Sequence, residues 1–221
     1  MKPLFRVKIC GITNPADALA AAAAGADAIG LNFYSKSPRY ITAEQAAEVV
    51  AVLPPHVARV GVFVNETPER ILELAKSLSL DWIQLHGDEP AAMLATLAPY
   101  RVIRAFRCSS ENQEEAFRWL VEAAHKALMP AAILLDAFHA SQFGGTGKKL
   151  DCAIVAQFRE RWSTMPIILA GGLTLNNVFE SIQSSRPNAV DTASGVETSP
   201  GKKDADLVRG FVANARDGLN L

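Results

Sequence analysis

The sequence contains only three cysteines, and their arrangement excludes two classes of small protein. Cys10, Cys108 and Cys152 are odd in number, far apart, and include no C-x-x-C pair. A disulfide framework and a zinc knuckle both need cysteines that are paired or closely spaced. Free thiols of this kind are typical of a reducing compartment, so we expect a cytoplasmic protein.

An excess of charge and long apolar runs are also missing. There are 22 basic and 23 acidic residues, giving a net charge of −1, and no basic block. The electrostatic footprint of a nucleic-acid or membrane-surface protein is therefore absent, and a small molecule is the expected partner. The longest apolar stretch, 18–26, stops at Asp27 and is too short to cross a bilayer. We expect neither a membrane segment nor an export segment.

The sequence does contain a repeated pattern of an apolar run followed by a helical segment. In 68–78, for example, Ile71, Leu74, Ala75 and Leu78 have the spacing of one buried helix face. Helix starts are predicted at Asn14-Pro15, Thr42, Thr67-Pro68, Thr174 and Asp204. The runs that predict strands are 5–13, 28–33, 59–64, 81–85, 101–106, 131–135, 166–170 and 188–193.

Eight such units favour a closed α/β barrel over an open sheet. In 221 residues each unit has about 28 residues, enough for a compact repeat of strand and helix. An open doubly wound sheet has five or six strands and its phosphate-binding glycines after the first, whereas here glycine pairs follow the seventh and eighth. No linker interrupts the series. We therefore predict one (β/α)8 TIM-barrel domain over residues 1–221.

Two side chains at predicted strand ends are candidates for proton transfer. Cys10 closes the first strand and Asp136 follows the sixth, at the end of a barrel where catalytic groups collect. Together they suggest one group that takes a proton from carbon and one that gives a proton to oxygen, with no metal needed. The alternatives are a buried core cysteine and an aspartate that caps a helix or pairs with an interior lysine.

The glycine pairs Gly171-Gly172 and Ser194-Gly195 are candidates for a phosphate site. They follow the last two strands, where barrels often bind phosphate, and glycine lets backbone N–H groups approach an anion. Ordinary turn glycines are the alternative.

Two more polar residues lie after predicted strands. Arg39, in the loop after the second strand, could receive a substrate carboxylate in bidentate fashion, or could be a surface arginine. His86 follows the fourth strand and could bind substrate or metal, or form a structural hydrogen bond. His56, His125 and His139 are at no comparable strand end, which argues against a histidine-rich metal centre.

Seven motifs follow one another along the chain. They are Lys8-Ile9-Cys10-Gly11-Ile12-Thr13; Gly30-Leu31-Asn32-Phe33 with Ser37-Pro38-Arg39; Gln84-Leu85-His86-Gly87-Asp88; Leu135-Asp136; Gly145-Thr146-Gly147; Ala170-Gly171-Gly172-Leu173; and Asp191 through Ser194-Gly195-Val196-Glu197. With these motifs in this order, the chain resembles the phosphoribosylanthranilate isomerase family of tryptophan biosynthesis along essentially its whole length.

The resemblance implies a (β/α)8 barrel and an Amadori rearrangement without a cofactor. We expect a monomer or a homodimer. It makes Cys10 the general base and Asp136 the general acid, and it places the substrate carboxylate at Arg39. By the same resemblance, the loops of Gly171-Gly172 and Ser194-Gly195 bind the phosphate, with His86 and Asp191 near the substrate. Thr192-Ala193 replaces the family's usual Val-Ser, which affects the detail of phosphate binding.

Lys8 is predicted to share a strand face with Cys10, because the two are two residues apart. A free cysteine with a pKa near 8.5 is only roughly 3% thiolate at pH 7, so a base at this position needs a nearby cation. We hypothesise that Lys8 lowers the pKa of the Cys10 thiol; the alternative is that Lys8 pairs with an interior carboxylate.

Three competing functions remain open at this point. A histidine-pathway aminoaldose isomerase shares the reaction type and the phosphate, but would have aspartate in place of Cys10. A metal-dependent sugar-phosphate epimerase would lose activity with a chelator. A non-catalytic phosphate-binding barrel would leave Cys10 and Asp136 without a role.

Overall fold

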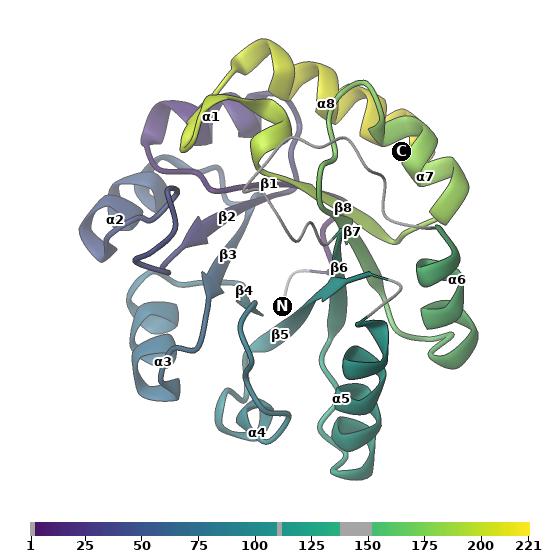
Figure 1. The fold of residues 1–221 in the computed structure, drawn as a ribbon. Coiled ribbons are helices and arrows are strands. Elements are labelled where there is room, and N and C mark those ends of the chain that lie inside the picture. Colours follow the sequence, from purple (N-terminus) through teal and green to yellow (C-terminus); the bar gives the residue numbers. More distant parts are fainter. Residues whose placement is uncertain (1–2, 110–111, 138–151) are drawn as a thin grey trace.

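Eight parallel strands close into a barrel in this computed structural model, which describes residues 3–109, 112–137 and 152–221, with only the backbone of Ala137 and Cys152. The strands pair in chain order and β8 pairs back to β1. The predicted (β/α)8 barrel is confirmed (Figure 1). The predicted glycine-rich segment 143–148 and His139 lie outside the described residues. The strands are β1 (Val7–Cys10), β2 (Ala28–Asn32), β3 (Ala58–Phe63), β4 (Trp82–Leu85), β5 (Arg101–Cys108), β6 (Ala132–Ala137), β7 (Ile167–Ala170) and β8 (Ala189–Thr192).

The helices surround the barrel (Figure 1). Asn14, Thr42, Thr67 and Asp204 each accept a backbone N–H as N-caps, as predicted. The helices are α1 (Pro15–Ala23), α2 (Ala43–Val52), α3 (Pro68–Ser77), α4 (Met93–Thr96), α5 (Gln113–His125), α6 (Cys152–Arg161), α7 (Val178–Ser185) and α8 (Ala205–Gly218).

The predicted cap at Thr174 is wrong. The α7 helix begins at Val178, and a turn precedes it. The Asn177 side chain accepts the N–H of Thr174, while the Thr174 carbonyl accepts the N–H groups of Asn177 and Val178. Asn177 therefore folds back on Thr174 and delays the helix by several residues.

Successive strand side chains alternate between the barrel interior and the layer under the helices. The interior is filled by an apolar cluster that includes Phe5 and Trp82, whose rings meet edge to face with centroids 6.0 Å apart. The larger core cluster lies between strands and helices and includes Ile9 and Cys108. Since the apolar interior packs the barrel, polar interior side chains collect where the strands end.

A short hairpin after β8 was not predicted from the sequence. It follows a 3₁₀ turn, η1 (Ser194–Val196), and consists of β9 (Glu197–Ser199) and β10 (Lys202–Lys203). Gly201 makes the bend with a φ of 80°. Thr13 donates to the Gly201 carbonyl, 2.6 Å away, so the hairpin is tied to the loop after β1.

A search of the described residues for a helix long and apolar enough to cross a membrane found none.

Candidate active site

Cys10 lies at the end of β1 on the interior face, and a missing side chain on β2 makes room for it. Gly30 is the register partner of Cys10. A Cβ on Gly30 would lie 2.6 Å from the Cys10 Sγ and 3.1 Å from the Lys8 Cε. The thiol and the lysine stem therefore share the space above Gly30, and the predicted common face of Lys8 and Cys10 is observed.

Lys8 is fully buried and forms an ion pair with Asp191 across the closing strands β1 and β8. The Lys8 Nζ lies 2.9 Å from the Asp191 Oδ2, and the two residues are register partners. Burial lowers the pKa of Lys8, but Asp191 and Cys10 raise it by more than burial lowers it. The net pKa is therefore raised, and the ammonium stays charged. The other carboxylate oxygen, Oδ1, is buried and has no hydrogen-bond partner among the described residues. It can accept a hydrogen bond from a ligand hydroxyl.

The net pKa of the Cys10 thiol is raised rather than lowered. Burial is the largest cause and raises it, Lys8 and Lys203 lower it, and Asp191 raises it. Lys8 thus acts in the predicted direction, but its ion-pair partner Asp191 acts against it. The alternative, that Lys8 pairs with an interior carboxylate, describes what the structure contains.

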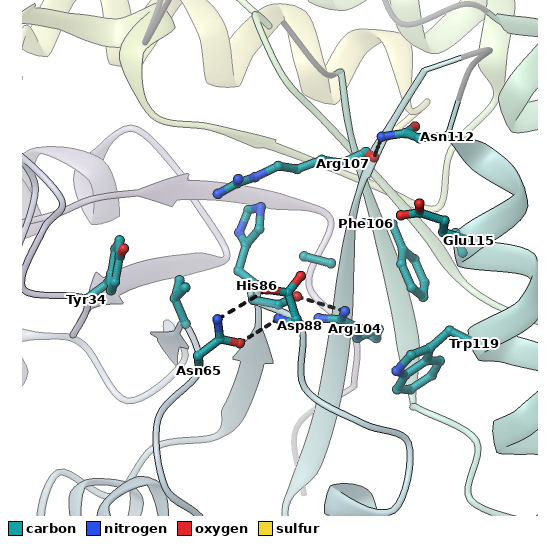
Figure 2. A pocket seen from close by; sticks show the side chains of 14 residues that line it. Tyr34, Asn65, His86, Asp88, Arg104, Phe106, Arg107, Asn112, Glu115 and Trp119 are labelled. Carbon is teal, nitrogen blue, oxygen red and sulfur yellow. Dashed lines mark hydrogen bonds between the residues drawn. The ribbon is translucent and has the colours of Figure 1, made fainter. Parts of the chain in front are cut away.

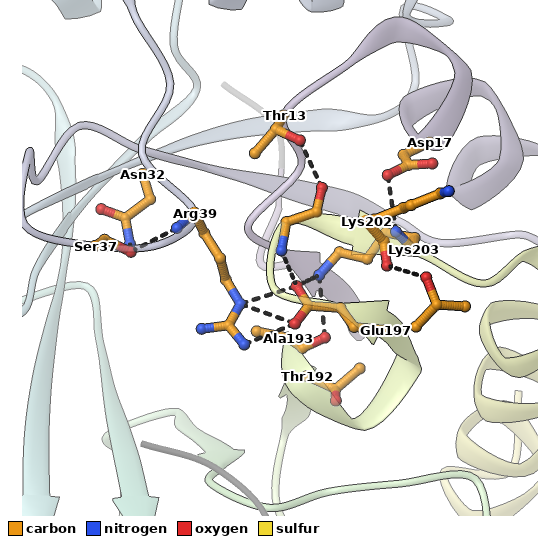
Figure 3. A network of polar contacts seen from close by, with 12 residues as sticks. Thr13, Asp17, Asn32, Ser37, Arg39, Thr192, Ala193, Glu197, Lys202 and Lys203 are labelled. Atoms are coloured by element: carbon orange, nitrogen blue, oxygen red, sulfur yellow. Dashed lines mark hydrogen bonds and ion pairs between the residues drawn. The ribbon is translucent and has the colours of Figure 1, made fainter. Parts of the chain in front are cut away.

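Arg39 packs against Gly11 in the loop after β1, and Glu197 binds its guanidinium (Figure 3). The Arg39 Nη2 lies 2.6 Å from the Glu197 Oε2, and Nε lies 2.8 Å from Oε1. Lys203 donates to the same Oε1 at 2.8 Å and to the Ala193 carbonyl at 3.0 Å. One edge of the guanidinium is therefore occupied. The edge formed by Nη1 and the second hydrogen of Nη2 has no partner among the described residues and could receive a carboxylate.

Asp136 projects into the barrel mouth from β6 and faces His86. The Asp136 Oδ2 lies 3.5 Å from the His86 Nε2. The Gln84 Nε2 lies 3.1 Å from the His86 Nδ1. With the amide nitrogen donating, Nδ1 is the acceptor, so a neutral His86 carries its proton on Nε2, toward Asp136.

A cavity of about 540 Å³ opens beside His86 (Figure 2). Its wall includes the rings of Phe106 and Trp119, which meet edge to face with centroids 5.6 Å apart. Arg107 extends over His86 in this view. The cavity is therefore an aromatic-walled extension of the mouth on the side of β3, β4 and β5.

The glycine loops after β7 and β8 differ in why they need glycine. Gly172 has a φ of 65° and open space where a Cβ would point. A Cβ on Gly195 would lie 1.8 Å from the Leu173 carbonyl oxygen, so Gly195 lets the two loops pack closely. Among the described residues, the space beside Gly172 is open, whereas Gly195 is needed for the close approach of the two loops.

Glu197 and Lys203 were assigned no role from the sequence, and neither was Gln84. The signal for Glu197 was weak, because a charged residue before Pro200-Gly201 is typical of a surface turn. Gln84 carried a clearer signal: a polar residue inside the apolar run 81–85 needs a buried partner. Within the described residues, no group of three or more His, Cys, Asp or Glu side chains is arranged to hold a metal ion.

Residues 7–214 match the model of a protein family described as N-(5'phosphoribosyl)anthranilate (PRA) isomerase. The chain is 45% identical over 216 residues to the N-(5'-phosphoribosyl)anthranilate isomerase of Trichlorobacter lovleyi, covering 98% of this chain and 100% of the relative. Its fold is similar to the crystal structure of phosphoribosyl anthranilate isomerase from Thermotoga maritima, with a TM-score of 0.85, 44% identity, and coverage of 97% and 100%.

A second solved structure is similar to this chain and has a bound ligand. It is described as phosphoribosyl anthranilate isomerase in complex with reduced 1-(o-carboxyphenylamino)-1-deoxyribulose 5-phosphate. The TM-score is 0.81 and the identity 42%, covering 97% of this chain and 100% of the other.

Proposed function

The chain belongs to the N-(5'-phosphoribosyl)anthranilate isomerase family, and we propose that Cys10 and Asp136 perform its reaction as general base and general acid. The reaction converts N-(5'-phosphoribosyl)anthranilate to 1-(o-carboxyphenylamino)-1-deoxyribulose 5-phosphate in tryptophan biosynthesis. Cys10 and Asp136 face the same barrel mouth from β1 and β6, and Asp191 lies within electrostatic reach of both. This juxtaposition carries the proposal.

The rearrangement needs two proton transfers that these groups can supply. Protonated Asp136 gives its proton to the furanose ring oxygen, and the ring C–O bond breaks to leave a Schiff base between C1 and the anthranilate nitrogen. The Cys10 thiolate then takes the proton from C2, and the electron pair moves to give an enolamine. That enolamine becomes the ketone when its C2 hydroxyl loses a proton and C1 gains one, so the overall change is an isomerisation.

Substrate binding is assigned to groups around the two catalytic residues. The free edge of Arg39 receives the anthranilate carboxylate. The loops of Gly171-Gly172 and Ser194-Gly195 bind the phosphate. Asp191 offers its Oδ1, which has no hydrogen-bond partner among the described residues, to a ribose hydroxyl, and we place His86 near the substrate because it lies within electrostatic reach of Asp191.

The proposal also includes an oligomeric state and a cellular location. We propose that the protein works as a monomer or a homodimer. We place the protein in the cytoplasm, because a reducing environment keeps the Cys10 thiol free.

Turnover is tested by mixing the purified protein with freshly generated N-(5'-phosphoribosyl)anthranilate and following the loss of its fluorescence. We expect Cys10→Ala and Asp136→Asn each to lower kcat by roughly 10²–10⁴-fold, the usual contribution of general acid–base catalysis. Cys108→Ala is the matched control, because it removes a thiol from the outer core and should retain turnover. If the parent turns over and either active-site variant keeps full kcat, the role of that residue is wrong.

A further inference from the structure

Three charged side chains from separate segments meet beside Cys10. The Arg39 stem passes so close to Gly11 that a Cβ there would lie 2.5 Å from the Arg39 Cδ. Glu197 joins this guanidinium to the Lys203 ammonium through one shared oxygen, Oε1 (Figure 3). These side chains therefore form a continuous series of contacts beside Gly11, the residue that follows Cys10. We call Arg39, Glu197 and Lys203 the charge cluster.

The charges around Cys10 do not cancel. Lys8 and Asp191 form one ion pair with a net charge of zero. The charge cluster contains two cations and one carboxylate, so it keeps one positive charge. Among the described residues, Lys8, Asp191, Lys203 and Arg39 lie within electrostatic reach of Cys10, and Glu197 joins Arg39 to Lys203.

We propose that Lys203 is the positioning residue that stabilises the Cys10 thiolate, because it gives the charge cluster its surplus positive charge. This inference rests on the proposed role of Cys10 as the general base. Lys8 does not supply that surplus, since Asp191 offsets its charge in the same ion pair.

The setting of Lys203 suits this role better than that of Arg39. The Lys203 side chain is 1% exposed, whereas that of Arg39 is 21% exposed. A buried charge is less screened by water and acts more strongly on its neighbours. Glu197 and the Ala193 carbonyl hold the ammonium in place. When a substrate carboxylate binds Arg39, its negative charge brings the net charge of the charge cluster and carboxylate to zero. Without Lys203, that net charge would be negative beside the Cys10 thiolate.

The test titrates the Cys10 thiol by the pH dependence of its alkylation with iodoacetamide, following the Cys10 peptide by mass spectrometry. Lys203→Met removes a positive charge, so we expect the apparent pKa to rise by about 1 unit, a tenfold loss of thiolate. Glu197→Gln removes a negative charge from the same contact, so the apparent pKa should fall. Lys203→Arg keeps the charge and should leave it near the parent value.

Thr13→Val is the matched structural control. It removes the hydrogen bond from Thr13 to the Gly201 carbonyl, which ties the hairpin to the loop after β1, but changes no charge. The Cys10 titration should then stay in place. Equal shifts in Thr13→Val and Lys203→Met, or shifts of the same sign in Lys203→Met and Glu197→Gln, would overturn the proposal. If Lys203→Met does not fold, the proposal is judged on Glu197→Gln alone. An apparent pKa of the Cys10 thiol that rises or stays unchanged in that variant would overturn the proposal.

Alkylation requires no turnover, so a failure of the proposed function can be told apart from a failure of the role assigned to Lys203. A titration that shifts as expected, with full activity in Cys10→Ala, would uphold the role of Lys203 and reject Cys10 as the base. In the parent background, Lys203→Met should also move the acid-side limb of kcat to higher pH, which a loss of packing alone would not do.

Discussion

An arginine–glutamate pair lies on each side of the barrel mouth, and the two pairs differ in what surrounds them. On the Cys10 side, Arg39 and Glu197 lie 2.6 Å apart, and the arginine side chain is 21% exposed. On the side of β4 and β5, Arg104 and Glu89 lie 2.8 Å apart, with side chains 7% and 1% exposed. Glu197 shares its charge with Lys203, whereas Glu89 has Arg104 as its cationic partner.

The second pair holds a loop in place. Arg104 also donates to the Leu85 and Gly87 carbonyls, while Glu89 accepts the N–H groups of Asn65 and Gly87. This is the loop that follows β4 and carries His86. The same kind of ion pair therefore has two settings: on the Cys10 side a third charge, Lys203, joins it, and on the β4–β5 side it fixes the backbone of a loop.

The largest expected effect breaks the second pair. Arg104→Met leaves Glu89 buried without its cation, and we expect a loss of about 3–5 kcal/mol in the free energy of unfolding. Arg39→Met leaves Glu197 paired with Lys203, so its loss should be about 1 kcal/mol or less, with a raised KM instead. Urea unfolding and steady-state kinetics of both variants test this contrast, which fails if Arg39→Met destabilises the protein as much as Arg104→Met.

The next effect concerns the space above Gly30 on the Cys10 side. A methyl group in Gly30→Ala would lie 2.6 Å from the Cys10 Sγ and force the thiol to move. Misplacement of a reacting group costs about 10–100-fold in kcat. Gly210→Ala is the control, because a Cβ in that helix meets nothing closer than 3.7 Å. Parental kcat in a folded Gly30→Ala protein would contradict the position assigned to the thiol.

A smaller effect is expected on the Asp136 side from Gln84→Met. Loss of the Gln84 amide removes the group that sets the His86 tautomer, so the Nε2 proton facing Asp136 is no longer favoured. We expect kcat to fall by about tenfold while the Cys10 alkylation titration stays unchanged, since Gln84 acts through His86. The ¹⁵N chemical shifts of the His86 ring report the tautomer directly, and an unchanged Nε2–H form would reject this role for Gln84.

The smallest effect is on acid stability. Burial alone would raise the pKa of Glu197, but hydrogen bonds from Arg39 and Lys203 bring it below the ordinary value of 4.5. A carboxyl with a depressed folded-state pKa stabilises the protein above its unfolded-state pKa, and this stability is lost as the pH falls through the folded-state value.

As the pH falls below about 4.5, the free energy of unfolding should therefore decrease less steeply in Glu197→Gln than in the parent. Urea unfolding across that range measures the change. Glu73→Gln, in the exposed Arg70–Glu73 pair, is the control and should follow the parent. If the free energy of unfolding depended on pH identically in Glu197→Gln and in the parent, Arg39 and Lys203 would not stabilise the ionised Glu197 carboxylate.

The sequence by itself determined the barrel and the strand ends that carry Cys10 and Asp136. Apolar runs, helix caps and the two-residue alternation of a strand are local properties, so they predicted eight strand–helix units and the shared face of Lys8 and Cys10. The one wrong cap, at Thr174, depends on a side chain that folds back from Asn177.

Only the tertiary structure decided which groups surround those residues. Lys8 and Asp191 are 183 positions apart, and Arg39 and Glu197 are 158 apart. Closure of the barrel brings β8 beside β1. The hairpin after β8 then contacts the loop after β1 through Gly201 and the loop after β2 through Glu197, which also binds Lys203. A local pattern cannot specify such pairs, because the charge near Cys10 depends on which distant side chains the closed fold brings into contact.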